Sequence, residues 1–190
     1  MRIVSGARPS NAVRMRRATA QYVTDAMVDA VLFAWGHTLA TWAPDDEPRE
    51  EARRLGSTTH ALLEALRKRG LKLGVVSNAS DPPEDLHREL ADSGIAERID
   101  VAVFAGEGGR AKPDRELFER ALDALGVPAE AALFVGDRLE EDVRGAAQLG
   151  MTTVQALWFR ADEHPDDVEA DYQAFTQMDV LNVVRRLNGE

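Results

Sequence analysis

The chain has no cysteine among its 190 residues, so disulfide bonds, thiol catalysis and cysteine-ligated zinc are excluded. No apolar run approaches the roughly 18 residues that a membrane-spanning helix needs. Basic residues are also scarce relative to acidic ones, since 23 Lys and Arg face 33 Asp and Glu, for a formal net charge of -10. This balance argues against binding a nucleic-acid backbone or an anionic membrane surface. Together these absences are typical of a cytoplasmic protein.

Residues 1–26 differ in composition from the rest of the chain. They contain five arginines and a single acidic residue, and they lack the apolar stretch of a secretory signal. We interpret them as an N-terminal extension, disordered or weakly helical. Residues 27–190 then form one domain, which is large enough to bury a core of its own.

Within this domain, short apolar runs rich in Val, Leu and Phe alternate with amphipathic segments. The runs are expected to be buried strands, and the segments between them helices. The expected strands are 28–33, 71–78, 99–105, 131–137 and 151–157, and the expected helices are 47–70, 83–94, 114–126, 140–150 and 177–188. Strands that alternate with helices form a parallel sheet with both faces covered. The sequence therefore predicts an α/β, three-layer, Rossmann-like fold with five parallel strands, and an acidic solvated loop over 160–175.

Polar side chains follow the ends of these strands, where parallel sheets bind their ligands. Ser77, followed by Asn78, offers a hydroxyl and a free backbone N–H to an anion, and Lys112 precedes a helix start at the same edge. Asp137 ends a strand and Asp142 follows five residues later, so the two carboxylates suit Mg²⁺, a cation that prefers oxygen ligands. Taken singly, each has an ordinary alternative: a turn, a solvated lysine, or acidic residues that cap a helix.

The order of these residues along the chain resembles motifs two, three and four of the haloacid dehalogenase superfamily of hydrolases. The stretch "LFAWGHTL" then stands where motif one belongs, an apolar strand followed by Asp-x-Asp-Gly-Thr-Leu. The resemblance covers roughly residues 27 to 188. It implies that Ser77, Asn78 and Lys112 bind a phosphoryl group. It also implies that Asp137 and Asp142, with the backbone carbonyl of Gly36, bind Mg²⁺.

Motif one departs from the family pattern at both of its acids. The resemblance places a nucleophilic Asp at Ala34, where it would form an aspartyl-phosphate, and a general acid/base at Gly36. A methyl group cannot attack phosphorus, and losing a covalent nucleophile can cost on the order of a millionfold in turnover. The alanine has two explanations: a deliberate substitution that traps substrate, or a natural member that has lost turnover.

Candidates to replace the nucleophile are His37, next to Gly36, and the pair Asp45 and Asp46 in the following loop. The ordinary role of the two aspartates is to solvate that loop and to cap the helix that follows it. The segments between the motifs are too short for a cap domain, so a capless, open site is expected. Capless relatives tend to act on large substrates or to close the site with a partner subunit, which leaves a homo-oligomer open. The expected partner is a phosphorylated small molecule or macromolecule.

Two functions follow from these observations. The first is a Mg²⁺-dependent phosphohydrolase scaffold whose turnover is impaired or lost through Ala34. The second is a non-catalytic protein that uses the same pocket to bind a phosphate group or a partner.

Overall fold

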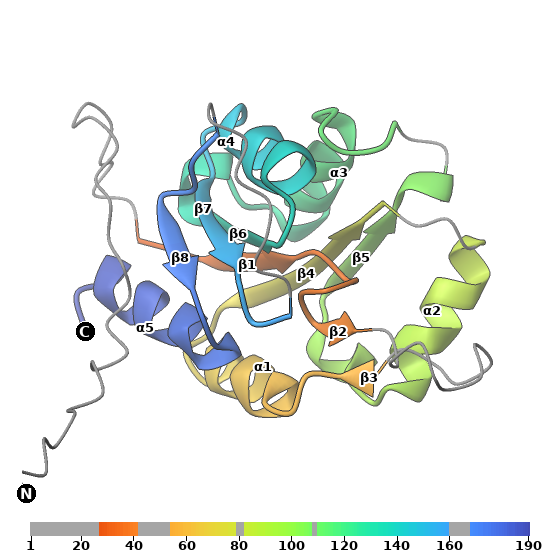
Figure 1. Ribbon diagram of the computed structural model, residues 1–190, viewed down its shortest axis with the longest axis horizontal. Coiled ribbons are helices and arrows are strands. Elements are labelled where there is room, and N and C mark those ends of the chain that lie inside the picture. Colours follow the sequence, from red (N-terminus) through yellow and green to blue (C-terminus); the bar gives the residue numbers. More distant parts are fainter. Residues whose placement is uncertain (1–26, 42–53, 79–81, 108–109, 160–167) are drawn as a thin grey trace, which may run out of the picture.

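The computed structural model describes residues 27–41, 54–78, 82–107, 110–159 and 168–190 (Figure 1). The expected extension 1–26 and the pair Asp45 and Asp46 lie outside the described residues. A six-stranded parallel sheet in the order β5-β4-β1-β6-β7-β8 forms the centre of the molecule. Its strands are β1 (Ala30–Phe33), β4 (Lys72–Ser77), β5 (Val101–Phe104), β6 (Ala132–Gly136), β7 (Thr152–Ala156) and β8 (Tyr172–Ala174). A short antiparallel pair, β2 (Ala40–Thr41) and β3 (Arg54–Leu55), follows the first strand.

Helices cover both faces of the sheet, as the alternating pattern predicts. The helices α1 (Thr59–Arg67), α2 (Pro83–Asp92) and α5 (Gln177–Leu187) lie on one side, and α3 (Glu116–Leu125) and α4 (Gly145–Ala147) on the other (Figure 1). Side chains along β1, and that of the residue after it, alternate between these two sides of the sheet. Val31 and Phe33 pack on the first side, and Leu32 and Ala34 pack on the second. The predicted three-layer α/β fold is confirmed, and the described residues contain no second, cap-like domain.

The predicted number of strands is wrong by one. Residues 172–174 fall in the segment expected to be a solvated loop, but they form β8 and pair in parallel with β7. The carboxylate of Asp171 helps to hold β8 against β7, because its Oδ2 accepts from both the backbone N–H and the hydroxyl of Thr153, at 2.8 Å each. A strand of three residues carries too little periodicity to be seen in sequence.

Two expected helices also differ from the observed ones. The helix expected over 47–70 begins only at Thr59, because β3 and the turn at Gly56 precede it. A side chain at Gly56 would collide with Gln177, whose amide lies 2.5 Å from the position of the missing Cβ. The helix expected over 140–150 begins as a π-helical turn, Leu139–Arg144, and continues as the short α4.

The two ends of the described domain lie side by side. The Oδ1 of Asn188 accepts from the backbone N–H of Val28 at 2.7 Å, and its Nδ2 donates to the Val28 carbonyl at 3.1 Å. One amide side chain after α5 thus satisfies both backbone groups of the residue that leads into β1. None of the helices in the described ranges combines the length and hydropathy that crossing a bilayer requires.

Candidate functional site

A cavity of about 330 Å³ opens at the carboxyl ends of the central strands. Because β1 lies between β4 and β6, the loops that follow these three strands meet at one edge of the sheet. The cavity is lined by Ala34, Trp35, Gly36, His37, Ser77, Asn78, Ala105, Ala111, Lys112, Asp137, Arg138, Glu141 and Asp142. The pocket therefore brings together the seven residues to which the resemblance gives a role, and His37 lines it as well.

Ala34 continues β1 into the pocket and is held firmly in place. Its backbone N–H donates to the carbonyl of Val135 at 2.9 Å, which extends the pairing of β1 with β6. Only 4% of Ala34 is exposed. A methyl group, which can neither attack nor bind a cation, thus stands at the position where the resemblance leads us to expect a nucleophilic Asp.

The turn after Ala34 contains a backbone conformation that favours glycine. The N–H groups of Leu39 and Ala40 both donate to the carbonyl of Trp35 at 3.1 Å, which closes the turn. His37 has a φ of 55°, in the left-handed region. The resemblance places a glycine of the family motif at this position, and the imidazole lines the cavity at some cost in backbone strain.

A buried polar network supports the same turn from below. The carbonyl of Thr38 accepts from the indole Nε1 of Trp158 at 2.9 Å and from the Nε2 of Gln177 at 3.2 Å. The same Nε2 atom donates to the hydroxyl of Thr59 at 2.7 Å, and the Gln177 Oε1 accepts from the hydroxyl of Thr58 at 2.8 Å. Sequence reasoning missed this support, because its partners are more than a hundred residues apart and carry no motif.

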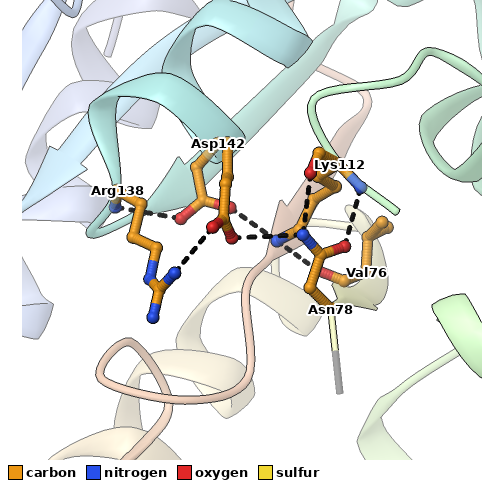
Figure 2. A network of polar contacts seen from close by, with 6 residues as sticks. Val76, Asn78, Lys112, Arg138 and Asp142 are labelled. Carbon is orange, nitrogen blue, oxygen red and sulfur yellow. Dashed lines mark hydrogen bonds and ion pairs between the residues drawn. The ribbon is translucent and has the colours of Figure 1, made fainter. Parts of the chain in front are cut away.

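Lys112 and Asp142 form a buried ion pair at the pocket (Figure 2). The Lys112 Nζ lies 2.5 Å from the Asp142 Oδ1 and also donates to the carbonyl of Val76 at 3.0 Å. The other carboxylate oxygen of Asp142 accepts from the backbone N–H of Arg138 at 3.1 Å. The phenyl ring of Phe134 lies beneath the ammonium, with its centroid 5.3 Å from Nζ. The lysine is thereby fixed at the end of β4 rather than solvated.

Gly136 makes room for this pair. A Cβ at position 136 would lie 2.3 Å from the Oδ2 and 2.5 Å from the Cβ of Asp142. The π-helical turn Leu139–Arg144 brings Asp142 back over the end of β6, onto the face of this glycine. The spacing of glycine, Asp137 and Asp142 in the sequence therefore reflects a close approach of backbone and carboxylate.

Asn78 joins three loops of the pocket (Figure 2). Its Oδ1 accepts from the backbone N–H of Lys112 at 2.7 Å, and its Nδ2 donates to the Lys112 carbonyl at 2.8 Å. The Nδ2 also donates to the Oε2 of Glu141 at 3.1 Å, and the Oε1 of Glu141 accepts from the Nη1 of Arg138 at 2.6 Å. Glu141 and Arg138 are pocket residues that sequence reasoning missed, although both lie between or beside the two predicted metal ligands.

Asp114 lies two residues before α3, whose N-cap is Arg115. Its Oδ1 accepts from the backbone N–H of Glu116, the first residue of the helix, at 3.1 Å. This hydrogen bond, together with the guanidinium groups of Arg110 and Arg115, holds the pKa of the Asp114 carboxyl below its usual value. The carboxylate is half-buried and does not line the cavity, so its charge serves the helix start rather than the pocket.

The donor atoms around the cavity fit a hard cation that keeps several of its waters. The carboxylates of Asp137 and Asp142 line the cavity together with Gly36, and oxygen ligands of this kind suit Mg²⁺. Among the described residues, no group of three or more acidic or histidine side chains is placed to enclose a metal. A cation here would therefore be held by two carboxylates at most, and it would compete with the Lys112 ammonium for Asp142.

Comparisons with known proteins agree with this geometry. The family model described as haloacid dehalogenase-like hydrolase matches residues 41–150, which include Ser77, Lys112, Asp137 and Asp142 but begin after the turn at Gly36. A phosphoserine phosphatase of Thermus thermophilus is 41% identical over 111 residues, 58% of this chain and 42% of the relative. A glyceraldehyde 3-phosphate phosphatase of Methanocaldococcus jannaschii is 32% identical over 130 residues, 68% of this chain and 56% of the relative.

A solved structure of similar sequence shows the same fold. The HAD phosphatase from Thermococcus onnurineus superposes with a TM-score of 0.61 at 31% identity, over 68% of this chain and 58% of that chain. The chain spans about half the length of the curated relatives it matches. Because the family model covers more than half of the sequence, and its motifs two to four converge on one pocket, the chain belongs to the haloacid dehalogenase-like hydrolases.

Proposed function

We propose that this chain binds a phosphate monoester, with Mg²⁺, in the pocket at the end of β1, and does not form the aspartyl-phosphate of the family. The observation that carries the proposal is Ala34, a buried methyl at the end of β1 in a pocket that otherwise keeps Ser77, Lys112, Asp137 and Asp142. The binding groups of the family motifs are therefore present without the nucleophile.

The residues of the pocket divide into anion-binding and cation-binding groups. Ser77 contributes a hydroxyl at the end of β4, and Lys112 contributes the only lysine ammonium among the described residues that line the cavity. Asp137 and Asp142 would hold Mg²⁺, which, when bound, neutralises charge on the phosphoryl oxygens. Without Asp at position 34, we expect these groups to bind and orient a phosphate ester, and among the residues that the structure describes β1 offers no carboxylate to attack phosphorus.

The names of the relatives support a small phosphate monoester as the ligand. The two curated relatives are phosphatases of phosphoserine and of glyceraldehyde 3-phosphate. Phosphorylated macromolecules carry the same terminal group, so a phosphate monoester is the chemistry that the pocket is proposed to recognise. This is the non-catalytic alternative of the sequence analysis, with the phosphohydrolase scaffold retained.

Restoring the nucleophile tests the proposal. Wild-type protein and Ala34→Asp would be assayed for hydrolysis of p-nitrophenyl phosphate with MgCl₂, with Ala34→Asn as the isosteric control. We expect the wild type and Ala34→Asn to hydrolyse the ester at the background rate. Ala34→Asp should hydrolyse it at least about 100-fold faster than background, since a nucleophile can contribute far more than this to turnover. Gly36→Asp added to Ala34→Asp should raise turnover further, because a Cβ at Gly36 meets no atom within 4 Å.

Binding and turnover together decide the outcome. Wild-type protein should bind inorganic phosphate in a calorimetric titration with MgCl₂ present. Hydrolysis by the wild type at the rate of Ala34→Asp would contradict the proposal, and loss of that activity in His37→Gln would then identify the imidazole as the nucleophile. Absence of phosphate binding by both proteins would contradict it as well.

A further inference from the structure

We propose that Asn78 is a positioning residue that holds Lys112 at the end of β4, instead of a contact of the bound anion. The inference rests on the proposed phosphate pocket and assigns a specific role to one of its residues. Asn78 accepts from the Lys112 N–H at 2.7 Å and donates to the Lys112 carbonyl at 2.8 Å (Figure 2). The side-chain amide of Asn78 thus satisfies both the N–H and the carbonyl of the Lys112 backbone.

The hydrogen-bonding capacity of Asn78 is used within the protein. An asparagine amide has two N–H donors. One goes to the Lys112 carbonyl and the other to the Oε2 of Glu141 at 3.1 Å. An anion needs donors, so a phosphate could bind the Asn78 amide only by displacing one of these bonds.

Lys112 depends on such an anchor because it belongs to neither a strand nor a helix. It lies in the connection between β5 and α3, beyond residues 108–109, which are not described. Asn78 holds its backbone, and the carbonyl of Val76 accepts from its Nζ at 3.0 Å. The end of β4 therefore holds Lys112 at both its backbone and its ammonium. Positioned groups lose effect when they shift by about 1 Å.

The chain contains a matched control for this interaction. Asn188 pairs with the N–H and the carbonyl of Val28 at 2.7 and 3.1 Å, which is the same amide-to-backbone arrangement. Val28 precedes the amino end of β1, whereas the cavity lies at the carboxyl ends of the strands, and Val28 does not line that cavity. Asn188→Ala therefore removes the same kind of bond without touching the pocket.

The test is calorimetric titration of the full chain with inorganic phosphate in MgCl₂. We expect Asn78→Ala to weaken binding at least about tenfold and Asn188→Ala less than about twofold. In a Lys112→Gln background, Asn78→Ala should change the affinity by less than about twofold, because the group that Asn78 positions is gone. Equal affinities of the wild type and Asn78→Ala would overturn the inference. An undiminished effect of Asn78→Ala in the Lys112→Gln background would also overturn it, since it would indicate direct contact with the anion.

A second measurement keeps the inference testable if Lys112→Gln does not fold. Hydrogen exchange of the Lys112 backbone amide should be at least about tenfold faster in Asn78→Ala than in the wild type, and unchanged in Asn188→Ala. An unchanged exchange rate in Asn78→Ala would contradict the positioning role. Exchange also separates the two proposals, because a wild type that binds no phosphate contradicts the proposed function while the Lys112 amide still reports on Asn78.

Discussion

The ammonium of Lys112 lies 2.5 Å from the carboxylate of Asp142, and the two side chains are 3% and 2% exposed. Taking two charges out of water is costly, and their mutual attraction repays that cost only when the remaining hydrogen bonds are made. Here they are made, by the carbonyl of Val76 on one side and the backbone N–H of Arg138 on the other. The pair thus links a residue proposed to bind the anion to one proposed to bind the cation.

Breaking this pair should cost the protein much of its stability. We expect Lys112→Met to lower the free energy of unfolding by about 3–5 kcal/mol, because it leaves the Asp142 carboxylate buried without its cation. Lys68→Met is the matched control, since the Lys68–Glu64 pair is 71% and 52% exposed and should contribute less than about 1 kcal/mol. Urea unfolding measures both. Equal losses at the two lysines would show that burial of the Lys112–Asp142 pair has no energetic consequence.

Phosphate and Mg²⁺ should strengthen each other's binding. Three carboxylates and two cationic side chains line the cavity: Asp137, Glu141 and Asp142 against Lys112 and Arg138. Phosphate alone meets excess negative charge, and Mg²⁺ alone meets the ammonium beside Asp142. We expect each ligand to lower the Kd of the other by the same factor, at least about tenfold, as linkage requires. Calorimetric titrations of each ligand, with and without the other, measure the two factors, and a phosphate Kd independent of Mg²⁺ would contradict this prediction.

Gly136 should tolerate no side chain. Gly136→Ala places a Cβ 2.3 Å from the Asp142 Oδ2 and 2.5 Å from its Cβ, so the carboxylate and the turn that carries it must shift. We expect a loss of about 1–3 kcal/mol in the free energy of unfolding, together with weaker phosphate binding. Gly36→Ala is the control for stability, because the added methyl meets no atom within 4 Å. Thermal unfolding that gives the two variants the same midpoint would refute the close approach.

The network under the turn predicts an effect at a distance from the pocket. Gln177→Leu keeps the volume but removes the donor to the Thr38 carbonyl and to the Thr59 hydroxyl, both of which are buried. We expect a loss of about 1–3 kcal/mol in unfolding free energy, since two buried hydrogen bonds are lost. The Thr38 carbonyl keeps its bond from the Trp158 indole, and the Thr59 hydroxyl keeps its bond to the Leu39 carbonyl. Gln148→Leu, at an exposed position, should change stability by about 0.5 kcal/mol or less. Chemical denaturation compares the two, and similar small changes would show that the network is not needed.

Local patterns in the sequence were enough to predict most of the sheet and the pocket. The buried strands β1, β4, β5, β6 and β7 are continuous apolar runs, and the polar residues after them meet because parallel strands end at one edge. The strand β8 was missed because three residues carry no period, and its pairing depends on Asp171 holding Thr153. Likewise, Gln177 and Trp158 support the turn at Thr38 through contacts that no local motif encodes.

The family motif indicated which residue types belong in the pocket, but not how they are bonded. The sequence predicts Asp142 as a metal ligand. In the structure its carboxylate accepts from the Lys112 ammonium and from the backbone N–H of Arg138. Glu141 had no motif of its own, yet it lies in the cavity and accepts from Asn78 and Arg138. Such partnerships arise from side-chain conformations within the packed fold, which spacing along the chain does not determine.

The amide of Asn188 sits on the backbone of Val28, so the last helix ends where the first strand begins. The two ends are therefore close enough for a short linker to join them. A circularly permuted protein that starts at residue 71, runs to 190, and continues through a linker of a few residues from 27 to 70 would open the chain at the exposed turn of Gly70. Each loop of the pocket would remain intact, and the first motif would be synthesised last instead of first.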